Sequence, residues 1–309
     1  MDITVAVCTW NRAHLLRRTL ESLRRLEVPA GTRWEVLVVD NASTDATPAL
    51  LNEYRALLPL RVVREARQGT AHARNRAARE AAGAFLLCTD DDVEVDAAWL
   101  RAYVDAIAAH PQAELFGGTV LPRFEGRPPR WLRSGWSLVS GAYAARELGT
   151  HGFDLEACIA HLPYGPSYAV RTALARRFPC DIGLGPNGAQ RNVGDETTAL
   201  SQMLLAGARG RWVPQARAWH WVSRERQTVA FVAEHFRLAA RAPLPLQPPA
   251  RPKSAEKLRR AAARHRRRYW LARALLRPAP VWLEHLRAAQ RARGRLDALG
   301  PPAAAPVAA

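Results

Sequence analysis

The sequence lacks the long apolar segment that a membrane-spanning helix requires. No uninterrupted run of about 18 apolar residues occurs in its 309 residues, so no transmembrane helix is expected. Cysteine is scarce, and the four cysteines (Cys8, Cys88, Cys158 and Cys180) show no metal-ligand spacing, which predicts free thiols in a reducing compartment. The first apolar run begins at Ile3 and leaves no room for a signal peptide. These absences together predict a cytoplasmic protein.

Acidic residues are nearly absent from the C-terminal fifth of the chain. Residues 251–295 hold fifteen Lys and Arg but only two acidic residues, Glu256 and Glu284, whereas the formal net charge of all 309 residues is +17. Most of the basic character therefore belongs to this segment. Its apolar residues recur at spacings of three and four, which predicts an amphipathic helix; they are Leu258, Ala261, Ala262, His265, Tyr269, Ala272 and Leu276.

A second basic helix is expected over residues 281–299, after the helix-breaking Pro278 and Pro280. Three interpretations of the two helices stay open. They contact an anionic membrane surface, bind nucleic acid by neutralising phosphates, or pack on the rest of the chain with a solvated arginine face. Aromatic residues are sparse and no nucleic-acid motif is present, which disfavours nucleic acid. Peripheral contact with the inner face of a membrane is favoured narrowly.

The first 121 residues alternate between strand-like and helical patterns. Apolar runs at 3–8, 36–39, 60–63, 84–88 and 115–121 are separated by segments with helical periodicity. This alternation predicts βαβ units and a mostly parallel, Rossmann-like sheet flanked by helices, an α/β fold. The 48% hydrophobic fraction is enough for a buried core.

The rest of the chain divides by composition. Residues 122–162 are rich in Pro, Gly and Trp and are expected to be irregular, and helical and strand-like patterns resume over 164–240. We therefore expect one domain over 1–240, with halves 1–121 and 122–240. After it come a proline-rich linker at 241–253, basic helices at 254–299 and a disordered tail at 300–309.

Charged residues stand at the carboxyl ends of the expected strands. Asp90, Asp91 and Asp92 directly follow the apolar run 84–88, and adjacent carboxylates are tolerated best around a divalent cation or polar ligand. The alternative is a solvated acidic turn. Other strands end at 9–12 and 40–45, and a parallel sheet aligns such ends along one crevice. Each residue alone is explained as well by a turn or a helix cap, but their joint placement favours a binding site.

This ordered set of motifs resembles the family 2 glycosyltransferases, which transfer sugars from nucleoside-diphosphate donors and have the GT-A fold. The resemblance runs from about residue 3 to about residue 236, roughly three quarters of the chain. No single motif is specific, but their order is. The motifs are Val-Cys-Thr-Trp-Asn-Arg at 7–12, Val-Val-Asp-Asn-Ala-Ser-Thr-Asp at 38–45, Ala-Arg-Asn at 73–75, Thr-Asp-Asp-Asp at 89–92, Gly-Pro-Ser-Tyr-Ala-Val-Arg at 165–171, Gly-Asp-Glu at 194–196 and Trp-His at 219–220.

The resemblance implies a nucleotide site and a metal site in the N-terminal half. Asp40 would accept a hydrogen bond from the nucleotide base, and Arg74 would lie beside the base or phosphate. Asp92, the last residue of an Asp-x-Asp motif, would ligate Mg²⁺ or Mn²⁺ with Asp90 and His220. The full set of implied nucleotide-binding residues is Thr9, Asn11, Arg12, Asp40, Arg74, Asp90 and Asp91.

The resemblance also implies a catalytic carboxylate in the second half. The family usually has Glu-Asp after a glycine, with the second carboxylate as base, whereas this chain has the reverse order, Asp195-Glu196. By position Glu196 is the expected base, although a shift of one residue would exchange the two. Ser167 stands where relatives often have Asn, and with Trp131 and Trp136 it is the expected acceptor contact.

The implied reaction is a single displacement with inversion at the anomeric carbon, in polysaccharide biosynthesis or a similar pathway. The donor would be a UDP- or dTDP-sugar and the acceptor a hydroxyl of a glycan, a lipid-linked or a small molecule. Two alternatives stay open. A sugar-1-phosphate nucleotidyltransferase shares the fold type but would carry a glycine-rich loop where residues 9–12 stand. A non-catalytic protein with this fold would bind nucleotide or membrane only.

Overall fold

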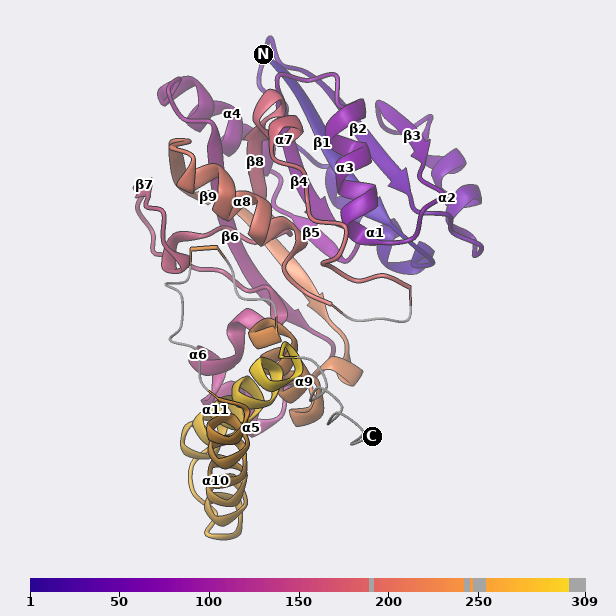
Figure 1. The fold of residues 1–309 in the computed structure, drawn as a ribbon. Coiled ribbons are helices and arrows are strands. Elements are labelled where there is room, and N and C mark those ends of the chain that lie inside the picture. The colour runs from indigo at the N-terminus through magenta and orange to yellow at the C-terminus, as the bar shows by residue number, and fades with distance from the viewer. Residues whose placement is uncertain (189–191, 242–244, 247–253, 300–309) are drawn as a thin grey trace, which may run out of the picture. The chain divides into compact units, whose positions relative to one another are not determined.

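The computed structural model describes residues 1–188, 192–241, 245–246 and 254–299 of the chain. In this part of the chain one nine-stranded sheet has the order β3-β2-β1-β4-β8-β6-β9-β5, with β7 paired to β9 (Figure 1). The strands are β1 (Asp2–Thr9), β2 (Arg33–Asp40), β3 (Leu60–Arg64), β4 (Phe85–Asp90), β5 (Val93–Val95), β6 (Leu115–Phe124), β7 (Asp154–Leu155), β8 (Tyr168–Arg171) and β9 (Gly210–Val222).

The first four strands of the sheet are parallel, as the alternating pattern predicts. Their register sets Thr9 opposite Asp40 and Cys8 opposite Asp90, so the carboxyl ends of β1, β2 and β4 lie along one edge. β8 is antiparallel to β4 and β6, while β6 and β9 are parallel to each other. The predicted α/β fold with a mostly parallel sheet is confirmed, and its strand ends are aligned as the site requires.

Helices cover both faces of this sheet because the buried strands are apolar on both sides. On one face Val5 and Val7 pack with α1 (Ala13–Leu23), α2 (Thr47–Tyr54) and α4 (Trp99–Ala109). On the other face Ala6 and Leu37 pack with α3 (Thr70–Glu80), α7 (Thr172–Arg177) and α8 (Asp195–Leu205). Burial of each large apolar side chain contributes about 2 kcal/mol, and the fully buried Trp99 anchors the first layer.

The segment expected to be irregular holds short elements instead. After β6 come α5 (Arg130–Ser134), α6 (Trp136–Val139) and the 3₁₀ turn η1 (Ser140–Tyr143), and a further 3₁₀ turn, η2 (Ile159–His161), follows β7. The C-terminal part contains η3 (Arg224–Arg226), α9 (Val229–Arg241), α10 (Ala255–Ala274) and α11 (Ala279–Asp297). The second basic helix thus begins two residues earlier than predicted, since a proline is tolerated in the first turn of a helix.

The chain divides into two compact units, and the division differs from the expected one. Of the described residues, the first unit holds 1–124, 143–188, 192–222 and 245–246, and the second holds 125–142, 223–241 and 254–299. The structure thus groups α5, α6 and α9 with the basic helices, where the sequence pattern predicted one domain over 1–240. Close backbone approach explains this grouping: a Cβ on Gly294 of α11 would lie 2.0 Å from the Arg237 carbonyl oxygen of α9.

Two predicted segments fall mostly outside the described residues. They are the linker at 241–253, of which residues 241, 245 and 246 are described, and the tail at 300–309. Among the described residues, no helix combines the length and the apolar character needed to cross a membrane. The four cysteines are free, and each is half-buried.

Candidate active site at the carboxyl ends of the strands

The loop after β1 is joined to the acidic triplet by Arg12. The Arg12 Nη1 donates to Asp91 Oδ1 at 3.0 Å and to Asp92 Oδ2 at 3.2 Å, and the Thr9 hydroxyl donates to Asp91 Oδ2 at 2.8 Å. Burial raises the pKa of Asp91 to about 6 even though Arg12 lowers it, and the negative charge of Asp91 raises the pKa of Arg12.

Both carboxylate oxygens of Asp91 therefore bind groups inside the protein, and the residue is only 4% exposed. In this structure Asp91 positions Arg12 and Thr9, and its direct contact with a nucleotide stays a prediction. Arg12, whose side chain is 39% exposed, keeps a surface that a ligand can reach.

Asp92 faces His220 across the sheet edge. β5 pairs with β9 so that Val93 lies opposite His220, and the Trp221 amide donates to the Asp92 carbonyl oxygen at 2.8 Å. This register brings His220 Nε2 to 3.2 Å from Asp92 Oδ1. The other ring nitrogen, Nδ1, lies 2.6 Å from the Tyr143 carbonyl oxygen.

These contacts fit a divalent cation. A carbonyl oxygen only accepts hydrogen bonds, so Nδ1 of His220 carries a proton, and Nε2 is the ring atom that faces the Asp92 carboxylate and could bind a cation between them. A second-sphere carbonyl that fixes the tautomer in this way is usual for metal-binding histidines. Carboxylate oxygens with one imidazole nitrogen suit Mn²⁺ or Mg²⁺.

Arg74 of α3 gathers three carboxylates from two other elements. Its guanidinium lies 2.8 Å from Asp90 Oδ1 at the end of β4, 2.7 Å from Glu196 Oε2 and 3.3 Å from Asp195 Oδ2 in the first turn of α8. Gly194, with φ +103°, turns the chain into α8, and carboxylates are favoured in the first turn of a helix. The Arg74 side chain is 12% exposed, so these ion pairs are little screened by solvent.

The two carboxylates of α8 have opposite pKa shifts. Burial raises the pKa of Asp195, against the effect of Arg74, and the charge of Glu196 raises it further. Burial also acts to raise the pKa of Glu196, but the charge of Arg74 and a hydrogen bond with Asp195 outweigh it, and its pKa is lowered. Near neutral pH the proton therefore resides on Asp195 and Glu196 is a carboxylate, a pair of neighbouring acids with separate roles.

The side chains of Arg74, Asp90 and Glu196 converge on the backbone at Gly165. A Cβ added to Gly165 would lie 2.9 Å from Arg74 Nη2 and 3.3 Å from both Asp90 Oδ2 and Glu196 Oε1. The sequence pattern includes Gly165 in a motif but gives it no role. The structure shows that a residue without a side chain is needed beside the Arg74 cluster.

The loops after β1 and β2 are joined by their own hydrogen bonds. The Asn11 amide donates to Ser43 Oγ at 3.0 Å, and Asn11 Oδ1 accepts from the Thr44 amide at 2.7 Å. Asp40 Oδ1 accepts from the Ser43 amide at 2.9 Å. Asn11 thus holds the two loops together through its side-chain oxygen, and Asp40 lies beside them at the end of β2.

Asn41 is a positioning residue that the sequence reasoning missed. Its Nδ2 donates to the Glu65 and Arg67 carbonyl oxygens, and its Oδ1 accepts from the Gly69 amide at 2.9 Å. Gly69 immediately precedes α3, so these bonds fix the start of the helix that carries Arg74. The signal available in the sequence was an Asn directly after a candidate site aspartate.

The three expected acceptor contacts belong to different parts of the chain. Ser167 is fully buried, and its hydroxyl oxygen lies 2.9 Å from both Trp99 Nε1 and the Tyr103 hydroxyl. Its predicted acceptor contact is corrected, because this hydroxyl belongs to the core. Trp131 and Trp136 lie in the second unit, where Trp131 packs on Trp282 with ring centroids 5.9 Å apart.

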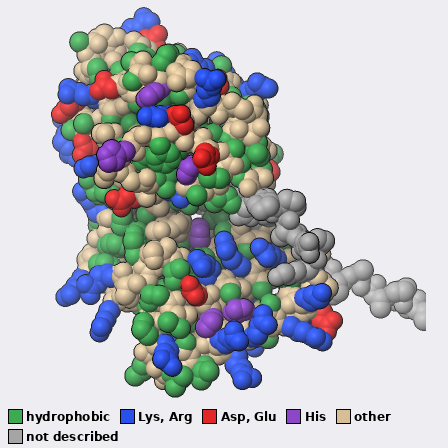
Figure 2. All heavy atoms as spheres, turned by 90° about the vertical axis from the view of Figure 1, so that its left-hand side faces the viewer, with side chains coloured by type: hydrophobic (Ala, Val, Ile, Leu, Met, Phe, Trp, Pro, Cys, Tyr) green, Lys and Arg blue, Asp and Glu red, His purple; other side chains and the backbone are tan. Residues whose placement is uncertain are grey.

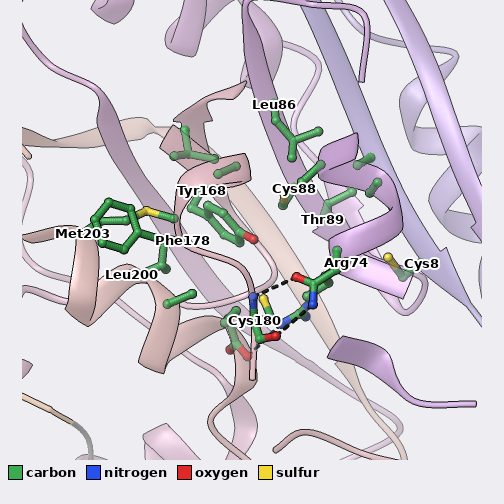
Figure 3. A pocket seen from close by; sticks show the side chains of 18 of the residues that line it. Cys8, Arg74, Leu86, Cys88, Thr89, Tyr168, Phe178, Cys180, Leu200 and Met203 are labelled. Carbon is green, nitrogen blue, oxygen red and sulfur yellow. Dashed lines mark hydrogen bonds and ion pairs between the residues drawn. The ribbon is translucent and has the colours of Figure 1, made fainter. Parts of the chain in front are cut away.

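A narrow apolar pocket lies behind the Arg74 cluster (Figure 3). The Arg74 ion pairs lie on one side of it, and the side chains of Phe178, Leu200 and Met203 gather on the other. Its volume of about 30 Å³ has room for one or two water molecules and excludes a nucleotide. Burial raises the pKa of the Cys88 thiol to about 11. The pocket is therefore an apolar backing that keeps the dielectric low around Arg74.

Comparison with known proteins agrees with this arrangement. Residues 4–163 match the family described as "Glycosyl transferase family 2". The chain is similar to succinoglycan biosynthesis protein ExoM of Rhizobium meliloti, with 28% identity over 237 residues that cover 76% of this chain and 71% of ExoM.

Two solved structures share its fold at lower identity. Staphylococcus aureus TarS 1–349 in complex with UDP-GlcNAc has a TM-score of 0.56 at 20% identity, covering 89% of this chain and 74% of that one. The mannosyltransferase PcManGT of Pyrobaculum calidifontis, in complex with GDP-Man and Mn²⁺, has a TM-score of 0.60 at 22% identity, covering 96% and 87%. These likenesses show the GT-A fold.

Proposed function

The chain belongs to glycosyl transferase family 2, and we propose that it transfers a sugar from a nucleoside-diphosphate donor to an acceptor hydroxyl with inversion at the anomeric carbon. The observation that carries this proposal is the cluster of Arg74, Asp90 and Glu196 around Gly165, at the same sheet edge as Asp92 and His220. A cation for the diphosphate and a carboxylate for the acceptor proton are the two groups that the reaction needs. The rival nucleotidyltransferase is disfavoured by the family match.

Glu196 is the proposed base. It is ionised, because Arg74 and Asp195 lower its pKa against the effect of burial, and its Oε1 lies 3.3 Å from the position that a Cβ on Gly165 would take. As the acceptor oxygen bonds to the anomeric carbon, Glu196 takes the hydroxyl proton and the bond to the diphosphate oxygen breaks. Asp195, which carries a proton, keeps Glu196 oriented by a hydrogen bond.

The donor contacts follow from the positions of the cations and of Asp40. Arg12 and Arg74 offer forked donors to the diphosphate, and Arg74 would exchange part of its carboxylate contacts for phosphate oxygens. Asp40 would accept from the N–H of a uracil or thymine base, and we propose UDP- or dTDP-sugars as donors. The UDP-GlcNAc complex of TarS and the GDP-Man complex of PcManGT support a nucleotide-sugar of some kind.

A divalent cation would be held by Asp92, Asp90 and His220. When bound, Mg²⁺ or Mn²⁺ neutralises the negative charge that grows on the departing diphosphate. The chain itself holds the ligands in place: Tyr143 fixes the His220 ring and Arg12 orients Asp92. The Mn²⁺ in the PcManGT complex supports this cofactor.

The acceptor is proposed to be a hydroxyl of a glycan, either free or lipid-linked. The name of ExoM, a succinoglycan biosynthesis protein, supports polysaccharide assembly. Trp131 and Trp136 stay candidates for the acceptor wall.

Turnover of candidate donors tests the proposal. Wild-type protein is incubated with UDP-, dTDP- and GDP-sugars, Mn²⁺ and a panel of glycan acceptors, and release of the nucleoside diphosphate is measured. We expect acceptor-stimulated release from a UDP- or dTDP-sugar, and a product of inverted anomeric configuration by NMR. Release that Glu196→Gln leaves unchanged would overturn the role of Glu196, and a product of retained configuration would overturn the single displacement.

A further inference from the structure

The end of the α10–α11 hairpin exposes a cluster of large apolar side chains. Among the described residues, twelve large hydrophobic side chains are exposed, and five of them fall within the twelve positions 270–281. They are Trp270 (61% exposed), Leu271 (54%), Leu275 (58%), Leu276 (90%) and Val281 (42%). We call these five residues the hairpin tip. Figure 2 shows hydrophobic side chains among Lys and Arg side chains in the lower part of the view, where α10 and α11 lie in Figure 1.

The tip is not needed to hold the hairpin together. Leu258 and Ala272 of α10 are buried, as are Trp282, Leu283 and Leu286 of α11. The buried side is closed further by Tyr269, whose ring packs edge-on against Trp282 at 6.0 Å, and by the Arg273 guanidinium 4.9 Å from the Trp282 ring centroid. The apolar side chains of the tip are therefore additional to a core that is already complete.

Along α10 the solvent-facing stripe changes from cationic to apolar. Residues spaced by three or four lie on one side of a helix, and the stripe that starts at Lys257 continues through Arg260, Arg264 and Arg267 to Leu271 and Leu275. All six side chains are exposed. A stripe of this kind is cationic over three turns and apolar where the helix ends.

Leu276 adds a second, independent observation. The Arg277 amide donates to the Ala272 carbonyl oxygen at 2.9 Å, which closes a Schellman-type end in which Leu276 has φ +51°. Gly or Asn is favoured at this position because a larger side chain is strained there. This chain has a leucine there, and it is 90% exposed. In water the leucine therefore has a strained backbone conformation and no compensating burial of its side chain.

The cations around the tip lack acidic partners. From Lys257 to Leu283 the sequence has nine Lys and Arg and no Asp or Glu. Among the described residues only one of these cations, Arg260, has a carboxylate partner, Glu256, and that pair is exposed. The hairpin therefore carries a dense positive charge that an anionic surface would complement.

We propose that the hairpin tip inserts into the headgroup region of an anionic lipid bilayer while the cationic stripe of α10 lies on its anionic headgroups. Trp270 and the three leucines supply the apolar contact, and arginines placed beside them supply the attraction to anionic lipid. A nucleic acid would use the arginines but leave the leucines in water. A second copy of the chain would set two cationic surfaces against each other. The proposal does not depend on the transfer reaction.

Vesicle flotation tests the proposal with the full chain. Vesicles of pure phosphatidylcholine are compared with vesicles that contain roughly 30% phosphatidylglycerol, whose negative surface potential attracts basic segments. The wild-type chain should float with the anionic vesicles and stay in solution with the neutral ones. The combined change Trp270→Ser, Leu271→Ser, Leu275→Ser and Leu276→Asn should weaken binding at least about tenfold.

Matched variants separate the two contributions. Arg264→Ser with Arg267→Ser and Arg268→Ser should weaken binding similarly and make the remaining binding less sensitive to salt. The control variants Leu57→Ser and Arg55→Ser remove an exposed leucine and an exposed arginine from the first unit and should bind as wild type does. Circular dichroism checks that every variant keeps its helices.

Depth of insertion supplies a readout independent of affinity. Lipids brominated on the acyl chain quench tryptophan that enters the apolar region. Quenching should be seen with wild type and should be reduced in Trp270→Phe. Absence of flotation with anionic vesicles would overturn the proposal. Lipid binding that is unchanged in the tip variant would overturn it as well. So would a wild-type chain that binds no lipid but forms a concentration-dependent dimer, or binds an RNA, in a way that the tip variant abolishes.

Discussion

The two charged regions of this chain handle charge in opposite ways. At the sheet edge Arg12 and Arg74 each pair with more than one acidic side chain. These acidic side chains stand at the end of β4 or in the first turn of α8. On α10 the arginines are exposed, and among the described residues one has a carboxylate partner. Matched buried charge holds a reaction site in shape before the substrate arrives, whereas unmatched exposed charge is available for an external partner.

Removal of Arg74 should have the largest effect of any single change. Arg74→Met leaves the carboxylates of Asp90 and Glu196 without a cation, and breaking a buried ion pair on one side costs about 3 kcal/mol or more. Turnover should fall by about 10³-fold or more. The free energy of unfolding, measured in urea, should drop by about 3 kcal/mol or more.

The matched control lies on the same helix. Arg76 pairs with Glu80 at 2.9 Å on the surface, with side chains 36% and 32% exposed. Arg76→Met should change the free energy of unfolding by less than about 1 kcal/mol. Equal destabilisation by the two variants would contradict the contrast between buried and exposed charge.

Separate replacement of each α8 carboxylate by its amide tests which of the two is the base. Glu196→Gln should lower turnover by 10²- to 10⁴-fold, roughly the contribution of a general base. Asp195→Asn should retain most of the activity, because an amide N–H can replace the proton that Asp195 donates to Glu196. The reverse ranking would assign the base to Asp195.

The pH profile of turnover gives a second test of the same point. The pKa of Glu196 is lowered from 4.5, so its carboxylate persists as the pH falls and activity should be lost only below about pH 4.5. If Asp195 were the base, its raised pKa, about 8, would place the loss of activity near pH 8. Turnover measured from pH 4 to 9 distinguishes the two, provided that circular dichroism shows a folded protein throughout.

A methyl group at Gly165 should have an intermediate effect. Gly165→Ala places a Cβ 2.9 Å from Arg74 Nη2 and displaces the guanidinium from its carboxylates. We expect turnover to fall by about 10²-fold while the free energy of unfolding changes by less than about 1 kcal/mol. In Gly183→Ala the new Cβ meets only the Asp181 carboxylate, at 3.3 Å, and this control should keep its activity.

The smallest effect is expected on the hairpin. Arg264→Ser with Arg267→Ser and Arg268→Ser removes three exposed charges, none with a carboxylate partner among the described residues, and should change the free energy of unfolding by less than about 0.5 kcal/mol per site. Urea denaturation beside the Arg74→Met variant measures this. A large loss of stability would show that the arginines serve the fold rather than an external partner.

Much of the fold could be predicted because its signals are local. Apolar runs of four or more residues gave the strands that became β1, β2, β3, β4 and β6, and helical spacing gave α1, α4 and α10. β5 and β7 have three and two residues, too short for any period to be visible. The boundary between the units depends on contacts such as Gly294 with Arg237, which are far apart in sequence.

The sequence predicts which residues belong to the site but not how they contact one another. Asp90, Asp91 and Asp92 are indistinguishable in sequence, yet the strand end directs Asp91 toward Thr9 and Arg12 inside the protein, whereas Asp92 faces His220. The meeting of Arg74 with both Asp90 and Glu196 joins three elements, and no spacing encodes it. Ser167 had the motif position of an acceptor contact, but its neighbours Trp99 and Tyr103 bind its hydroxyl in the core.

Calorimetric titration of UDP and dTDP, with and without Mn²⁺, measures whether this sheet edge holds a metal-assisted donor site. Wild-type protein should bind one of the two nucleotides, at least about tenfold more tightly with Mn²⁺ than without it, and Asp92→Asn should lose that dependence. Asp40→Asn should weaken binding with and without the metal. Failure of every nucleoside diphosphate to bind, or equal binding by Asp92→Asn with Mn²⁺, would contradict the account of a metal-assisted donor site at this sheet edge.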